Sequence, residues 1–416
     1  MKVLWFEILP PSRYMDRGDV IGGWQDSLER VVRKIEDVKL TIAFEANPGS
    51  EKKTIDGVFY YPFSVYYSGR DSFRNRYTWR ISERKISEAA LKVVEEVKPD
   101  VIHVFGTEWP YAMVASLTNI PVIVHIQGII KQYDNANYPP GFSHFDLIRE
   151  AGLNFRKQFS VYLNMLLRKD RLRLEQNIWK NVSFYMGRTE WDNKLSGILH
   201  PNRKYYHVDE ALRDRFVYNQ SVWEPKNDKL RLITTGCTTF WKGPDTLLRT
   251  ALILKKLGID FEWNVAGVMH DEVKNITERK IGFSFKEAGV NLIGFINPDQ
   301  LSIMLSNSSV YVHTAYVENS PNSICEAQAL GVPIVSTNVG GISSLVEHNV
   351  DGLLSPANDP WMLASNILLL YEDSNKAHFF SQNGKQKALH RHSDENIKRQ
   401  IYECYKNVIF INKMKK

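Results

Sequence analysis

Short apolar runs alternate with helix-length segments through most of this 416-residue chain, and this pattern constrains its fold more than any other feature. Strands that are apolar along their whole length are buried on both faces, and the helical segments between them act as crossovers. The pattern therefore predicts parallel sheets covered by helices, the α/β class. The predicted strands are Val3–Ile8, Leu40–Phe44, Val101–Phe105, Val122–Ile126, Ser183–Gly187, Leu230–Thr235, Phe261–Ala266, Val290–Ile293, Val310–Thr314 and Pro333–Ser336, and the predicted helices include Ile81–Val97, Asp245–Leu257 and Pro321–Leu330.

The series of strands restarts after Tyr218, which predicts two domains. The stretch Asn219–Leu230 is polar and contains a proline, as interdomain linkers do. A chain of this length also exceeds what one hydrophobic core normally organises. We therefore predict two Rossmann-like domains, 1–218 and 219–397.

Composition narrows the possible partners and the compartment. The net charge of +6 is modest for 416 residues and gives no reason to expect nucleic acid as a partner. Three cysteines lie far apart without metal-ligand spacing, so no metal site is predicted. The first residues form an apolar run broken by two prolines, which indicates a first strand rather than a signal peptide, and no apolar run reaches 18 residues. These features favour a cytoplasmic protein.

Two glutamates eight positions apart enclose a predicted helix start. Ser320 is the expected N-cap and Pro321 the first helical residue, with Glu318 before them and Glu326 after them. The free N–H groups at a helix N-terminus bind phosphate, and a carboxylate can accept hydrogen bonds from sugar hydroxyls. A ligand with a sugar, a pyrophosphate and a ribose would meet Glu318, the helix start and Glu326 in turn, which is the shape of a nucleotide sugar. The alternative is that Glu326 is a buried helix residue paired with a Lys or Arg.

The block "ENSPNSICEAQALGVPIVSTNVGG" and the following "VGGISSLVEHNVDGLL" resemble the C-terminal half-site of retaining family 4 glycosyltransferases with the GT-B fold. Weaker similarity extends over nearly the whole chain, and "MGRTEWDNKLSG" resembles the bacterial surface-polysaccharide branch of that family. The resemblance implies two Rossmann-like domains whose parallel sheets face an interdomain cleft. It also implies that the last helix, 398–416, crosses back to the N-terminal domain.

The resemblance assigns roles to individual residues. Glu318 would contact the donor sugar, Glu326 the ribose, and Lys242 the diphosphate, whose charge grows as the glycosidic bond breaks. The backbone groups that would face the sugar and phosphates belong to Asn319, Ser320, Pro321, Asn322 and Ser323. The nucleotide base would lie near Gly294, Phe295 and Ile296.

The sequence departs from the family pattern at Cys237, where the family usually has an arginine that binds the diphosphate, and Arg188 is the candidate replacement. Gly22 and Gly23 precede a helix and could approach the diphosphate closely. Gln127 and His125, at the end of a predicted strand, are candidate sugar or acceptor contacts, and the alternative for Gln127 is a structural turn residue. His103 on the previous strand is expected in the core.

These features favour a retaining hexosyltransferase that moves a sugar from a nucleotide-diphosphate donor to a hydroxyl of a glycan or lipid-linked glycan. It would need no metal and no other cofactor, because cationic groups stabilise the leaving diphosphate. The alternatives are a nucleotide-sugar epimerase on the same fold and a non-catalytic nucleotide-sugar-binding subunit. A phosphorylase is disfavoured because no pyridoxal-phosphate lysine context is found.

Residues 132–180 interrupt the strand–helix alternation with a basic stretch in which apolar residues are interleaved. A basic amphipathic helix of this type can lie on an anionic membrane surface. The competing interpretation is a helix pair that packs on its domain and has a solvated basic face. The first interpretation predicts peripheral contact with the inner face of the membrane.

Overall fold

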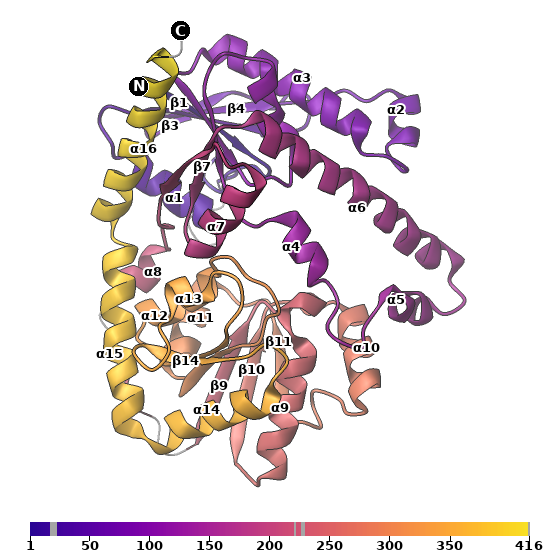
Figure 1. Cartoon of the computed structure of the whole chain (residues 1–416), viewed down its shortest axis with the longest axis vertical. Helices are drawn as coiled ribbons and strands as arrows, with labels where there is room; N and C mark the ends of the chain where they lie inside the picture. Colours follow the sequence, from indigo (N-terminus) through magenta and orange to yellow (C-terminus); the bar gives the residue numbers. More distant parts are fainter. Residues whose placement is uncertain (17–22, 220–221, 226–228, 415–416) are drawn as a thin grey trace. The chain divides into compact units, whose positions relative to one another are not determined.

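A computed structural model describes residues 1–16, 23–219, 222–225 and 229–414 (Figure 1). Gly22 lies outside these residues. The chain divides into two compact units. The first comprises Met1–Lys131, Phe159–Ala211 and Asp394–Lys416, and the second comprises Gln132–Gln158 and Leu212–Ser393. The second unit thus begins at Leu212 rather than at residue 219 and also includes part of the segment that interrupts the alternation.

The first unit is built on an eight-stranded sheet with the order β3-β4-β2-β1-β5-β6-β7-β8. All neighbouring strands are parallel except β3 and β4. The central strands are buried along almost their whole length, as their continuous apolar sequences require. The strands are β1 (Lys2–Glu7), β2 (Lys39–Glu45), β3 (Lys53–Ile55), β4 (Val58–Phe63), β5 (Val101–Phe105), β6 (Val122–His125), β7 (Phe184–Gly187) and β8 (Lys204–His207).

Helices cover both faces of this sheet. One face packs against α1 (Trp24–Val32) and α16 (Asp394–Met414), and the other against α3 (Arg80–Val97), η1 (Pro110–Ser116) and the C-terminal part of α6 (Phe155–Asn181). The hydroxyl of Tyr405 on α16 accepts a hydrogen bond from Trp5 Nε1 at 2.9 Å and lies 2.7 Å from His103 Nδ1. His103 is fully buried, in agreement with its predicted place in the core. The shorter helices of this unit are α2 (Gly69–Arg74) and α7 (Glu190–Leu199), and α4 (Ile130–Asn135) begins in it.

The second unit has a six-stranded, fully parallel sheet with the order β11-β10-β9-β12-β13-β14. β9 pairs with both β10 and β12, so the direction of strand addition reverses between β9 and β12. Ligands of open α/β sheets bind at the carboxyl ends of strands beside such a reversal. The strands are β9 (Leu230–Thr235), β10 (Phe261–Ala266), β11 (Val290–Gly294), β12 (Val310–His313), β13 (Ile334–Thr337) and β14 (Gly352–Ser355).

One large hydrophobic core joins this sheet to the helices of the unit. Those helices are α8 (Asp214–Val217), η2 (Phe240–Lys242), α9 (Pro244–Lys256), α10 (Asp271–Ile281), α11 (Pro298–Ser306), α12 (Asn322–Ala329), α13 (Ile342–Leu345), α14 (Pro360–Glu372) and α15 (Ser374–Arg391).

Residues 132–158, which include α5 (His144–Ala151), pack on the rest of the second unit. Phe142 joins Phe240, Val273 and Ile276 in a small hydrophobic cluster. Lys280 of α10 forms an ion pair with Asp146 at 2.9 Å, and Arg279 forms one with Glu150. This part of the basic segment therefore has the packed role that was one of its two predicted interpretations. No helix of the described residues is long and apolar enough to cross a bilayer.

Candidate functional site

The ion pair of Lys242 and Glu318 forms the centre of the candidate site in the second unit. Lys242 ends η2, just after β9, and Glu318 lies in the loop between β12 and α12, so both follow strands that flank the reversal. Glu318 is 4% exposed. Burial acts to raise the pKa of Glu318, but the Lys242 ammonium and the His313 ring outweigh it and lower the pKa to about 2. The carboxyl group of Glu318 is therefore ionised at neutral pH.

Two glycines allow the loops of this site to approach each other. Gly243 has φ +73° and Gly340 has φ +54°. A Cβ atom at Gly243 would lie 1.9 Å from the Thr314 carbonyl oxygen, and one at Gly340 would lie 1.9 Å from the Glu318 carbonyl oxygen. Only glycine fits at both positions, because each combines a left-handed backbone with direct backbone contact.

Further hydrogen bonds hold η2 against the end of β12. The backbone N–H of Tyr316 donates to the Trp241 carbonyl oxygen at 2.7 Å, and the Thr314 hydroxyl donates to the Lys242 carbonyl oxygen at 2.9 Å. These bonds fix the backbone on both sides of the ion pair. The ammonium and the carboxylate are thus positioned by loops whose own conformations are constrained.

His313, the last residue of β12, was not identified from the sequence. Its Nε2 atom lies 3.3 Å from Glu318 Oε1, and its Nδ1 atom lies 3.4 Å from the hydroxyl of buried Tyr311. The Tyr311 hydroxyl also lies 3.2 Å from Thr235 Oγ1 at the end of β9. A polar row therefore runs across the carboxyl ends of β9 and β12 to Glu318. A histidine at the end of a predicted buried strand is the signal that could have identified it.

The helix start lies one residue later than predicted. α12 begins at Asn322, and Pro321, with φ −73° and ψ 118°, occupies the N-cap position assigned to Ser320. Proline lacks a hydrogen-bonding side chain, and no side-chain cap is present in this helix. Asn319 and Ser320 are buried, whereas Asn322 and Ser323 are half-buried. The Ile324 N–H donates to the Pro321 carbonyl oxygen at 3.0 Å, but the N–H groups of Asn322 and Ser323 precede the first intrahelical bond and remain suited to an anion.

Glu326 lies on α12, 4% exposed, and forms an ion pair with Arg213. Arg213 Nε donates to Glu326 Oε1 at 3.1 Å. From the sequence, the alternative to ribose binding was that Glu326 is a buried helix residue paired with a Lys or Arg, and the structure contains such a pair. The predicted ribose contact of Glu326 stays a prediction, and Arg213 is a further residue that sequence reasoning missed.

Cys237 is 2% exposed, and its Sγ atom lies 3.9 Å from the Lys242 carbonyl oxygen. Burial raises the pKa of the thiol to about 12, despite the opposing charge of Lys242, so Cys237 is neutral. The cationic side chain that the family pattern has at this position is thus replaced by a small neutral one.

The residues predicted to lie near the nucleotide base follow β11, the outer strand of the same sheet. Gly294 ends this strand, Phe295 is 72% exposed and Ile296 is half-buried.

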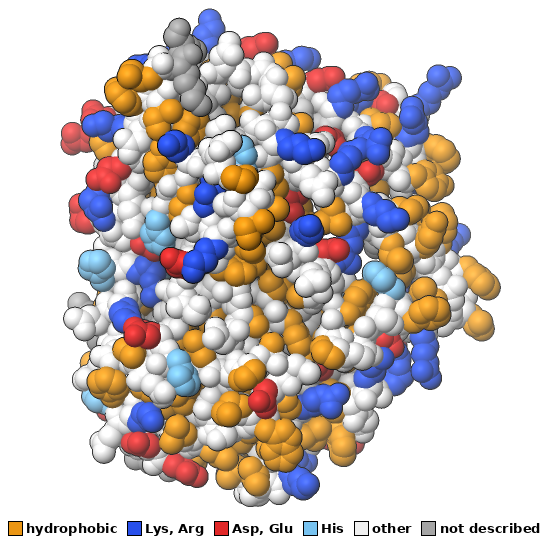
Figure 2. All heavy atoms as spheres, in the orientation of Figure 1, with side chains coloured by type: hydrophobic (Ala, Val, Ile, Leu, Met, Phe, Trp, Pro, Cys, Tyr) orange, Lys and Arg blue, Asp and Glu red, His pale blue; other side chains and the backbone are white. Residues whose placement is uncertain are grey.

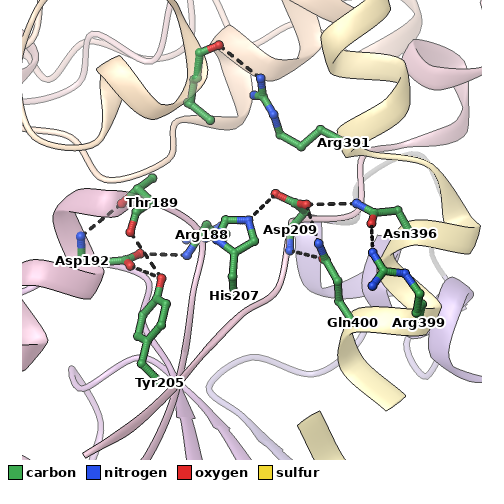
Figure 3. A network of polar contacts seen from close by, with 11 residues as sticks. Arg188, Thr189, Asp192, Tyr205, His207, Asp209, Arg391, Asn396, Arg399 and Gln400 are labelled. Atoms are coloured by element: carbon green, nitrogen blue, oxygen red, sulfur yellow. Dashed lines mark hydrogen bonds and ion pairs between the residues drawn. The ribbon is translucent and has the colours of Figure 1, made fainter. Parts of the chain in front are cut away.

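The remaining candidates lie in the first unit. Arg188, just after β7, is 5% exposed, pairs with Glu210 at 2.5 Å and lies over the Trp24 ring at 4.7 Å. In the network of Figure 3, Asp192 accepts hydrogen bonds from the backbone N–H of Arg188 at 2.9 Å and from the Tyr205 hydroxyl at 2.6 Å. Arg188 is therefore firmly anchored, and its proposed contact with a diphosphate stays a prediction.

The structure gives the other first-unit candidates different environments. Gly23 is the N-cap of α1, and its N–H donates to Asp26 at 3.0 Å. His125 is fully buried, and neither ring nitrogen has a hydrogen-bond partner in the described part of the chain. Burial, the largest cause, together with nearby His103 and Arg188, lowers the pKa of His125 well below its usual value. His125 is therefore a neutral ring in the interior, while Gln127 is half-buried beside it.

Residues 219–387 match the family described as glycosyl transferases group 1. This part of the chain is therefore a glycosyl transferase group 1 domain, and it contains Lys242, His313, Glu318 and Glu326. The glycosyltransferase family predicted from the block around Glu318 is confirmed for this domain, and its retaining stereochemistry stays a prediction.

Relatives and solved structures extend this similarity. The chain is 27% identical over 186 residues to the amylovoran biosynthesis glycosyltransferase AmsK of Erwinia amylovora. The matched region covers 43% of this chain and 45% of AmsK. It is 26% identical over 179 residues to the capsular polysaccharide biosynthesis glycosyltransferase CapM of Staphylococcus aureus. Here the matched region covers 43% of this chain and 46% of CapM. The matched region thus spans just under half of these relatives.

The sucrose-phosphate synthase of Thermosynechococcus elongatus superposes with a TM-score of 0.73 at 14% identity, covering 99% of this chain and 100% of that chain. Anabaena HepE, solved in complex with UDP and glucose, superposes with a TM-score of 0.66 at 16% identity, and the match covers 97% of this chain and 98% of HepE. Identities this low show the fold alone. The predicted architecture of two parallel-sheet α/β domains, as in GT-B glycosyltransferases, is confirmed.

Proposed function

We propose that this protein is a retaining hexosyltransferase that moves a sugar from a nucleotide-diphosphate donor to a hydroxyl of a glycan or lipid-linked glycan in surface polysaccharide synthesis. The main support is the ion pair of Lys242 and Glu318 beside the start of α12, at the carboxyl ends of β9 and β12. Similarity to AmsK and to the UDP complex of HepE supports the same assignment.

The chemistry follows from the charges of these groups. As the bond between the sugar C1 and the phosphate oxygen breaks, negative charge grows on the diphosphate, and Lys242 and the first turn of α12 stabilise it. Glu318, ionised and held by His313, accepts hydrogen bonds from donor hydroxyls. The acceptor oxygen bonds to C1 on the face that the phosphate leaves, and its proton passes to the departing phosphate oxygen. These cationic and dipolar groups take the place of a metal ion.

Calorimetry with UDP, GDP and ADP tests the binding step, and a screen of nucleotide sugars tests turnover. Tight binding of one nucleotide, followed by acceptor-dependent release of it, is expected. Product NMR should show the anomeric configuration of the donor. Acceptor-independent release of free sugar would indicate the epimerase alternative. Nucleotide binding without turnover of any nucleotide sugar would favour the non-catalytic nucleotide-sugar-binding subunit, for which neutral Cys237 is the supporting observation.

We also propose that the protein contacts an anionic membrane surface through residues 132–180. The exposed residues Phe155, Phe159 and Tyr162 follow helical spacing along α6, and Leu153 precedes them at 91% exposure. Arg156 and Lys157 lie among them and are exposed. Aromatic side chains beside cationic ones suit the boundary between acyl chains and anionic head groups.

A further inference from the structure

A cavity of about 350 Å³ opens on the outer helical layer of the first unit, and no step of the proposed transfer uses it. It lies between α3, η1 and the C-terminal part of α6, and all of its lining residues belong to that unit. Its volume is within the range of small-ligand sites. The polar lining residues that the following argument uses are Arg80, Glu83, Arg84, Glu88, Arg173 and Asn177.

The three arginines of this cavity differ in how firmly they are held. Arg173 is anchored by Glu83, at 2.6 Å, and its buried Nε atom has no hydrogen-bond partner among the residues that the structure describes. The side chains of Arg80 and Arg84 are about two-thirds exposed, and their ion pairs with described residues are long, 3.5 Å to Asp170 and 3.8 Å to Glu88. Exposed pairs of this kind contribute little energy. The guanidinium groups of Arg80 and Arg84 can therefore exchange these partners for a ligand anion at small cost.

The chain leading into the cavity is strongly cationic. Residues 70–85 include six cationic and two acidic side chains, a net charge of +4, against +6 for the whole protein. Arg70, Arg74 and Arg76 are exposed, and within the described residues their guanidinium groups have no ion-pair partner. Figure 2 shows Lys and Arg side chains gathered over the region where Figure 1 draws α2, α3 and α6. The resulting local potential attracts anions.

Apolar surface accompanies this charge. Met113 and Leu117, the latter 48% exposed, contribute to the wall of the cavity. Before the cavity residues, Tyr66, Phe73 and Tyr77 are 82%, 58% and 45% exposed, and the rings of Phe73 and Tyr77 are in contact at 5.6 Å. Apolar and aromatic side chains can pack against the C–H faces of sugar rings while arginine binds an acidic group. The surface therefore combines the two kinds of contact that an acidic sugar offers.

We propose that this cavity is an accessory binding site for an acidic sugar residue, carrying a carboxylate or a phosphate, of the glycan that the protein extends. The inference rests on the proposed function for its choice of glycan. The forked guanidinium groups of Arg80 and Arg84 suit discrete carboxylate or phosphate groups, which they can bind in bidentate fashion. The concave shape of the site also favours a discrete ligand over the flat surface of a bilayer. The hydroxyls of the sugar would pair with Asn177 and Glu88.

Calorimetry of the full chain with an oligogalacturonate of six residues tests the proposal. Maltohexaose serves as the neutral control and inorganic phosphate as the free anion. We expect the oligogalacturonate to bind, its affinity to fall with added salt, and maltohexaose not to bind. The variant R80E/R84E should weaken oligogalacturonate binding by about tenfold or more. Binding of inorganic phosphate alone, without the oligogalacturonate, would overturn the assignment to a sugar ligand.

Lys92→Glu is the matched control, because Lys92 is exposed on the same helix and does not line the cavity. It should leave oligogalacturonate binding within about twofold of the wild type. UDP binding, measured on every variant, separates this site from the donor site: R80E/R84E should bind UDP normally. If all variants bind oligogalacturonate equally, or if R80E/R84E loses only its binding to vesicles containing anionic lipid, the cavity is not a glycan site. Absence of transfer activity in the wild type, with oligogalacturonate binding intact, would refute the proposed function instead.

Discussion

Lys242 and Glu318, 76 residues apart in the chain, form an ion pair at the edge where the sheet of the second unit reverses its strand order. The pair is asymmetric, because the side chain of Glu318 is 6% exposed and that of Lys242 is 24% exposed. The ammonium group is thus the more accessible partner and can turn toward a phosphate while His313 remains beside the carboxylate.

Lys242→Met should weaken UDP binding. Removal of a charged hydrogen-bond donor costs about 1.5–3 kcal/mol, which corresponds to about 10- to 150-fold in Kd. Calorimetry with UDP measures the effect. Lys256→Met, an exposed lysine on α9, is the control and should bind UDP like the wild type. Equal affinities of the two variants would remove Lys242 from the donor site.

Glu318→Gln should lower stability at neutral pH but not at low pH. The folded-state pKa of Glu318, about 2, lies below the ordinary value of 4.5. The stability that this group contributes is therefore fully present above about pH 4.5 and is lost as the pH falls toward 2. This difference between the folded and the ordinary pKa of Glu318 corresponds to at most about 3 kcal/mol in the free energy of unfolding.

Urea unfolding of the wild type and Glu318→Gln at pH 7 and at pH 3.5–4 measures this difference, which should shrink as the pH falls. Glu347→Gln, an exposed glutamate paired with Lys387, is the control and should show little difference at either pH. A difference for Glu318→Gln that does not change with pH would contradict the low pKa.

Arg213→Met should destabilise the protein by up to about 3 kcal/mol, because it removes a charged partner of a nearly buried carboxylate. Adding Glu326→Gln removes that charge and should restore much of the lost stability. Urea unfolding of the single and double variants measures the coupling. Calorimetry with UDP then separates the two interpretations of Glu326. If Glu326 binds ribose, the double variant should regain stability but still bind UDP weakly, whereas restored UDP affinity would leave Glu326 a structural role only.

Some of these features could be predicted from the sequence and others could not, for physical reasons. β5, β9 and β10 begin and end at the predicted residues, because continuous apolar runs of strand length have few alternative folds. β8 was missed because its Lys204–His207 sequence is polar and aromatic, with exposed residues at both ends and half-buried tyrosines between them. The partners of the two glutamates, His313 and Arg213, could not be assigned, since their contacts depend on how distant segments meet.

Gly340→Ala should displace the loop that bears Glu318. The Gly340 backbone is left-handed, and a Cβ atom there would overlap the Glu318 carbonyl oxygen. Gly282→Ala is the control, because Gly282 has φ +82° but open space around it. The control should lose about 1–2 kcal/mol from backbone strain alone and keep UDP affinity. Gly340→Ala should lose more stability in thermal unfolding and should also bind UDP more weakly, and equal behaviour of the two variants would show that the contact is not restrictive.

Membrane contact through 132–180 should require both the exposed apolar side chains and the charges. In co-sedimentation with liposomes, binding should need anionic lipid and weaken as salt rises, because screening shortens the reach of surface charges to about 10 Å at 0.1 M salt.

Two double variants separate the apolar contribution from the charged one. Phe155→Ser with Phe159→Ser should reduce binding at all salt concentrations, since both side chains are exposed in this structure. Arg156→Glu with Lys157→Glu should reduce it chiefly at low salt. Phe379→Ser is the control, because Phe379 on α15 is 52% exposed, as Phe159 is at 51%. Binding that ignores both lipid charge and these variants would leave the segment its packed role alone, through the contacts of Asp146 and Glu150 with α10.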